Sequence, residues 1–139
     1  SMLDIKGELS KFSLDETNSV VIGSGILNAL GLRRAKDIDL VINEEVFQRL
    51  RGNERLKEEI NEYGVVTLKS SIMEIGVGWA DDSGFSFVYE DLLRNNQTTV
   101  VDGVRYLNLE TLLKIKKMWA REKDLQDIAM IERYLEENK

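Results

Sequence analysis

The sequence of 139 residues contains neither cysteine nor histidine. The absence of cysteine excludes disulfides, thiolate metal sites and cysteine nucleophiles. It is also compatible with a protein that works in the reducing interior of a cell. The absence of histidine removes the commonest general base, the commonest transition-metal ligand and every Ser-His-Asp scheme. Any chemistry must therefore use carboxylates, hydroxyls, Lys, Arg or a bound metal ion.

Proline is also absent, and glycine is limited to ten residues. With 42% hydrophobic and 32% charged residues, the composition is typical of a globular chain and excludes a disordered or fibrous one. A chain of this length forms one domain with a proper core. We expect a single domain over residues 2–139, with a sheet core over residues 2–108 and a helix pair over residues 109–139.

Long apolar runs are missing as well. No stretch approaches the roughly 18 uninterrupted apolar residues of a membrane span, and no basic region followed by an apolar core stands at the N-terminus. We therefore expect no membrane association and a cytoplasmic protein.

Acidic residues outnumber basic residues by 25 to 19, which gives a formal net charge of -6. General binding to nucleic acids is therefore disfavoured, since their backbones carry the same sign. One segment, from Arg105 to Lys123, departs from this balance. Its only acidic residues are Glu110 and Glu122. Its six basic residues are Arg105, Lys114, Lys116, Lys117, Arg121 and Lys123.

The hydrophobic pattern of the first third of the chain alternates between helix and strand. An amphipathic helix is expected from Leu3 to about Leu14. A β-branched strand is expected at Ser19–Ile22, and the turn Gly23–Gly25 leads from it into a helix that ends near Gly31. A second strand is expected at Asp37–Ile42.

The remainder of the chain predicts an α/β fold in an α+β layout, with a small mixed sheet flanked by helices. A surface helix from Glu44 to about Tyr63 is expected to break near Gly52 and to end at Gly64. The further expected elements are strands at 65–68, 72–79 and 85–88, a turn at 81–84, a short helix at 89–94, a hairpin of strands 98–101 and 104–107, and helices at about 109–121 and from about 123, the last with Leu125, Ile128, Ile131 and Leu135 on one face.

Two aspartates on the second expected strand carry the chemistry. The strand period of two directs Asp37 and Asp39 to the same face, whereas Ile38 faces the core. Two like charges this close require a partner, which divalent metal ions can supply. Mg²⁺ suits such a site because it takes a few carboxylates and completes its shell with water and phosphate oxygens.

Gly23 and Ser24 lie between a strand and a helix, where backbone N–H groups can approach a phosphate. The sequence Gly-Ser, then twelve residues, then Asp-Ile-Asp after an apolar strand resembles the signature of the polymerase-beta-like nucleotidyltransferase superfamily. That resemblance implies a third carboxylate on a later strand, acting as a metal ligand or as the base for the incoming hydroxyl. Glu74 is the best placed candidate, and an ordinary exposed strand residue is the alternative.

The C-terminal segment from Tyr106 to Asp127 is similar to the closing segment of small nucleotidyltransferases, including those that modify antibiotics. On its first helix, Lys114, Lys117 and Arg121 form one stripe that could face a triphosphate, or could be the solvated face of an amphipathic helix. Lys123, Asp124 and Asp127 belong to the same resemblance, and either phosphate contact or helix anchoring is open for them.

A competing interpretation takes Gly23-Ser-Gly-Ile-Leu-Asn28 as a dinucleotide fingerprint with Asp39 on the ribose. The fit is poor, because Asn28 replaces the third small residue and the acid comes early. The chain is also short for the two halves of a Rossmann fold.

The resemblance to the nucleotidyltransferases implies transfer of a nucleoside monophosphate from ATP or another NTP to a hydroxyl, with Mg²⁺ or Mn²⁺ as cofactor. The implied partners are the nucleoside triphosphate and either a small-molecule acceptor or a toxin-like protein. Three classes stay open: a modifier of small molecules, with a pocket that a homodimer could complete; an antitoxin-type enzyme; and a degenerate module that binds a partner without turnover.

Overall fold

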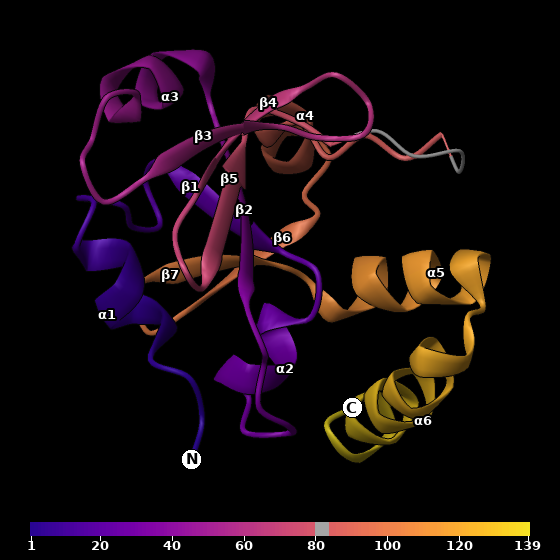
Figure 1. Cartoon of the computed structure of the whole chain (residues 1–139). Coiled ribbons are helices and arrows are strands. Elements are labelled where there is room, and N and C mark those ends of the chain that lie inside the picture. The colour runs from indigo at the N-terminus through magenta and orange to yellow at the C-terminus, as the bar shows by residue number, and fades with distance from the viewer. Residues whose placement is uncertain (80–83) are drawn as a thin grey trace.

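The computed structural model of the chain describes residues 1–79 and 84–139. Within these residues, seven strands form one mixed sheet in the order β3-β4-β5-β2-β1-β7-β6, and six helices flank it (Figure 1). The expected α/β class with an α+β layout and a C-terminal helix pair is confirmed. Most of the turn expected at 81–84 lies outside the described residues.

The strands are short, as expected for a sheet of this size. Their bounds are β1 Ser19–Ile22, β2 Ile38–Ile42, β3 Lys57–Ile60, β4 Val66–Lys69, β5 Met73–Gly76, β6 Thr98–Val101 and β7 Val104–Leu107. β1 and the β6–β7 hairpin coincide with the expected segments. Asp102 and Gly103, with φ of 49° and 77°, form the hairpin turn between β6 and β7.

The helices begin and end at residues that suit their positions. Their bounds are α1 Ile5–Ser10, α2 Gly25–Ala29, α3 Glu44–Leu50, α4 Tyr89–Arg94, α5 Leu109–Trp119 and α6 Glu122–Glu137. Asn43 and Asn108 cap α3 and α5, because each side chain accepts a backbone N–H from the first turn. α1 is shorter than expected, since Lys11 already lies outside the helix.

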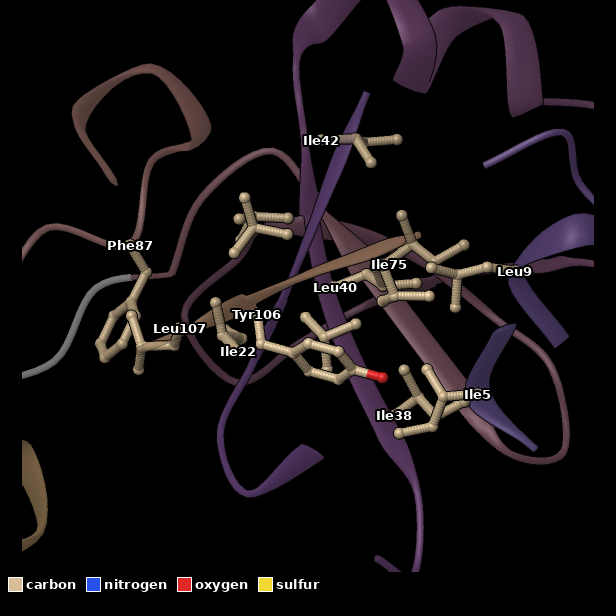
Figure 2. Close-up of a cluster of buried hydrophobic side chains, with 14 of the residues drawn as sticks. Ile5, Leu9, Ile22, Ile38, Leu40, Ile42, Ile75, Phe87, Tyr106 and Leu107 are labelled. Carbon is tan, nitrogen blue, oxygen red and sulfur yellow. The ribbon is translucent and has the colours of Figure 1, made fainter. Parts of the chain in front are cut away.

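The centre of the sheet combines antiparallel and parallel pairing. β1 runs antiparallel to β2, whereas β2 and β5 are parallel, and so are β1 and β7. On one face of the sheet, Leu40 and Ile75 pack with α1 residues Ile5 and Leu9, and all four side chains are at most 3% exposed (Figure 2). Ile38, Leu40 and Ile42 therefore face the core on the α1 side, whereas Asp39 faces the opposite side, where Val20 and Val41 are also buried.

Two of the expected elements are wrong. Lys57–Ile60 is an edge strand paired with β4, not the second half of a helix. Its Lys-Glu-Glu-Ile sequence lacks apolar alternation, so the backbone pairing with β4 decides its conformation, not its propensity. Residues 85–88 form no strand, although Phe87 is buried in the core beside Leu107 (Figure 2).

The helix pair at the C-terminus is confirmed, with one difference in its buried face. Ile131 is fully buried on α6, but Leu125 is 55% exposed and does not share that face as expected. Leu125 lies in the second turn of α6, near the end where α5 meets it. Among the described residues, no helix is both long and apolar enough to cross a membrane.

Candidate active site

Three carboxylates meet on the face of the sheet opposite α1. Asp39 on β2 pairs in register with Glu74 on β5, so their side chains lie on one face about one strand spacing, roughly 4.8 Å, apart at the backbone. Asp37 immediately precedes β2, and its negative charge repels that of Asp39. Asp37, Asp39 and Glu74 thus lie in one region of the sheet, and their role as a site stays a prediction.

Asp39 is the carboxylate of the candidate site whose pKa is shifted most clearly. Burial, together with the negative charges of Asp37 and Glu74, raises the pKa of Asp39 to about 6, and Lys69 partly opposes this rise. The fold thus disfavours the charged form of the Asp39 carboxylate. A bound cation would relieve both the burial of the charge and the repulsion between the acids.

Glu74 is held by a neighbour that the sequence analysis missed. The hydroxyl of Thr67, a residue only 1% exposed on β4, donates to Glu74 Oε2 at 3.2 Å. Lys69, two residues further on the same strand face, pairs in register with Glu74. Alternation along β4 put Thr67 and Lys69 on one face, but only the register between β4 and β5 could assign them to Glu74.

Gly23 and Ser24 connect β1 to α2 beside the carboxylates. Ile22 pairs in register with Asp39, and a Cβ built on Gly23 would lie 3.8 Å from Asp39 Oδ2. Gly23 has a φ of +71°, which favours glycine. Gly25 is required for packing instead, because a Cβ there would clash with Val21 Cγ1. The phosphate-binding role of Gly23 and Ser24 stays a prediction.

The carboxylates fit a metal ion that is completed by substrate. Among the described residues, no group of three or more acidic side chains lies close enough to enclose a metal ion by itself. Mg²⁺, however, is commonly held by one or two carboxylates together with phosphate oxygens. Asp37 and Asp39 could supply such a pair, and burial together with Asp37 and Glu74 raises the pKa of Asp39, a shift that a bound cation would oppose.

The expected basic stripe does not lie on one helix, because α5 ends at Trp119 and Arg121 is the N-cap of α6. Lys117 forms an exposed ion pair with Glu132 at 3.0 Å, and Arg121 binds Asp124 at 2.8 Å while stacking on Trp119. Lys114 and Lys123 are exposed. Triphosphate binding by Lys114, Lys117, Arg121 and Lys123 remains a prediction, and two of these side chains would have to exchange an existing partner.

Asp124 and Asp127 anchor helices. Lys116, 5% exposed on α5, lies 3.3 Å from Asp124 and 3.0 Å from Asp127 on α6. Arg33 binds both oxygens of Asp127 at 2.7 Å. The sequence analysis left Lys116 and Arg33 without a role, since nothing in the periodicity shows which basic residue is buried. This network joins the helix pair to the segment that enters β2.

The dinucleotide interpretation is wrong. A Rossmann unit requires parallel strands on either side of the first helix, whereas β1 and β2 are antiparallel. The side chain of Asn28 is also engaged, since it bonds both backbone groups of Leu3 at 2.9 Å and accepts the N–H of Ala35. Asn28 thus ties the N-terminal segment to the loop before β2.

Two cavities lie away from the carboxylates. One of about 450 Å³ lies between Leu32 and the α6 residues Ala129, Met130, Arg133, Tyr134 and Glu137. Another of about 240 Å³ lies between α1, α2 and the β6–β7 hairpin. Neither is lined by Asp37, Asp39 or Glu74.

No family model, curated protein or solved structure matches this chain. The assignment of a function therefore depends on the residues of the site and on their geometry.

Proposed function

We propose that this protein is a metal-dependent nucleotidyltransferase that transfers a nucleoside monophosphate from an NTP to a hydroxyl acceptor. The observation that carries the proposal is the register of Asp39 with Glu74, with the negative charge of Asp37 acting on Asp39 and the backbone of Gly23 close to the Asp39 carboxylate. The resemblance of the Gly-Ser and Asp-x-Asp motifs to those of the polymerase-beta-like nucleotidyltransferases supports the same class.

Each residue has a distinct task in the proposed reaction. The acceptor oxygen forms a bond to the α-phosphorus while the bond from that phosphorus to pyrophosphate breaks, and pyrophosphate leaves with the electron pair. Glu74, oriented by Thr67, receives the proton of the hydroxyl. Asp37 and Asp39 would hold Mg²⁺ or Mn²⁺, which supplies positive charge to the phosphate oxygens when bound.

The first experiment is calorimetric titration of ATP, GTP, CTP and UTP, each with Mg²⁺ or Mn²⁺. We expect one triphosphate to bind the wild type only when metal is present, and Asp37→Ala/Asp39→Ala to abolish binding. The matched control is Glu54→Ala/Glu62→Ala, which removes the same charge from exposed positions and should bind as the wild type does.

The opposite outcomes are informative. If the wild type binds none of the four triphosphates, the chain is not an active nucleotidyltransferase by itself, and the partner-binding alternative gains support. If binding persists without the two aspartates, the triphosphate binds elsewhere, and the assignment of Asp37 and Asp39 to its site is wrong.

A further inference from the structure

The cation that acts on the candidate site comes from the sheet and not from α5. Lys69 on β4 pairs in register with Glu74, which in turn pairs with Asp39, so the three side chains lie in one row on one face. Among the described residues, Lys69 is the cation whose charge acts on Asp39. Of the basic residues of α5, Lys116 and Lys117 are paired with α6, and Arg121, the N-cap of α6, is paired with Asp124.

Lys69 is held loosely enough to change partner. Its ammonium lies 3.6 Å from Glu59 Oε2 on the neighbouring strand β3, and both side chains are 40% exposed. Exposed pairs of this kind contribute about 0–1 kcal/mol. Glu59 also lies 3.8 Å from Lys57, so it keeps a cation when Lys69 moves. The flexible four-carbon stem of lysine can carry the ammonium back over Glu74.

The order of strands determines which part of a triphosphate Lys69 can reach. β1, with Gly23 and Ser24 at its end, lies on one side of β2, whereas β5 and β4 lie on the other. A triphosphate whose terminal phosphates lie at Gly23 and Ser24 places its α-phosphoryl group over Asp39 and Glu74. Lys69 then approaches that group from the flank opposite Gly23.

We propose that Lys69 is a further catalytic residue, whose ammonium contacts the α-phosphoryl group from the β4 side of the site and offsets its charge during transfer. This assignment rests on the proposed function. It adds a cation from β4 to the basic residues of the C-terminal helix pair that the sequence suggested. The attraction between a positively charged group and the transferred phosphoryl is strongest where water is partly excluded. The buried Thr67 provides such an environment beside Glu74.

The test is ³¹P NMR of the α,β-methylene analogue of the best-binding triphosphate, with Mg²⁺, on the wild type and three variants. Lys69→Met should weaken binding about tenfold and shift the α-phosphorus resonance of the bound analogue more than the β and γ resonances. Lys69→Arg, which keeps the charge, should restore most of the affinity. Lys57→Met is the matched control, because Lys57 shares Glu59 and pairs in register with Lys69 one strand further out.

The outcomes separate this inference from the proposed function. If the wild type binds no triphosphate, both fail. If the wild type binds but Lys69→Met matches Lys57→Met in affinity and in its α-phosphorus resonance, only the role of Lys69 is overturned. A shift confined to the β and γ resonances would equally overturn it.

Discussion

At the scale of single residues, Asp39 is the most unusual group, because the fold disfavours its charged form. Its pKa is raised to about 6 by burial first and then by Asp37 and Glu74. A group with a raised pKa in the folded state stabilises the fold fully below its unfolded pKa, and loses that contribution as the pH rises through the folded value. The metal-free protein therefore carries an electrostatic penalty at neutral pH.

Replacing Asp39 should remove this penalty. We expect Asp39→Asn to raise the free energy of unfolding at pH 7.5 in EDTA by roughly 2–3 kcal/mol, the value that corresponds to such a pKa difference. At pH 4 the gain should nearly vanish, because the wild-type carboxyl is then neutral in the fold. Urea unfolding at both pH values measures this. An equal gain at both values would mean that the asparagine stabilises by packing or hydrogen bonding and not by removing charge.

At the scale of elements, the helix pair depends on one buried cation. Lys116 on α5 is surrounded by Asp124 and Asp127 of α6, and all three residues are at most 5% exposed. Removing one partner of a buried ion pair leaves an uncompensated charge. The exposed pair between Lys117 and Glu132 joins the same helices but stays in water.

Lys116 and Lys117 therefore form a matched comparison. We expect Lys116→Met to lower the free energy of unfolding by about 3–5 kcal/mol and Lys117→Met to change it by less than about 1 kcal/mol. Denaturant unfolding followed by far-UV circular dichroism measures both. Similar values for the two variants would show that water reaches the Lys116 network and screens it.

Elements were also predicted with unequal success, for a physical reason. β1, α4 and the β6–β7 hairpin have local signals, namely β-branched runs, apolar periodicity and the Asp102-Gly103 turn. β3 has none, because Lys57–Ile60 is an exposed edge strand whose conformation follows from pairing with β4. Strand propensity measures a half-buried surface, which this edge does not offer.

At the scale of the whole molecule, the titrating groups predict an optimum of stability in mildly acidic solution. Burial raises the pKa of Asp124, but hydrogen bonds from Arg121 and Lys116 outweigh burial and lower the pKa to about 2. Asp127 is likewise lowered, by Arg33 and Lys116 against burial. A lowered pKa stabilises the fold above the unfolded value and is lost as the pH falls through the folded value.

Combined with Asp39, these groups should give a two-sided profile. In EDTA, we expect the melting temperature to rise from pH 2 to about 4, to be highest between roughly pH 4 and 6, and to decline above that range. Thermal melts followed by circular dichroism from pH 2 to 8 measure this profile. Mg²⁺ or Mn²⁺ with the triphosphate should reduce the decline above pH 6. A steady rise to pH 8 without metal would contradict the environment assigned to Asp39.

By itself, the sequence determined the class of the fold and the strand that carries Asp39, and it proposed Asp37, Asp39 and Glu74 as the candidate site. Local patterning was sufficient there, because alternation puts Asp37 and Asp39 on one face and the Gly-Ser turn lies next to them in the chain. The absence of histidine and cysteine also restricted the chemistry to carboxylates, hydroxyls, amines and metal ions.

Only the tertiary structure decided which partners these residues have. The register of β4 against β5 assigned Thr67 and Lys69 to Glu74, and the docking of α6 on α5 buried Lys116 between two aspartates. These pairings join residues through strand register and helix contact, which no local period encodes. The tertiary structure thereby placed Lys69 of the sheet, and not a residue of α5, in register with Glu74.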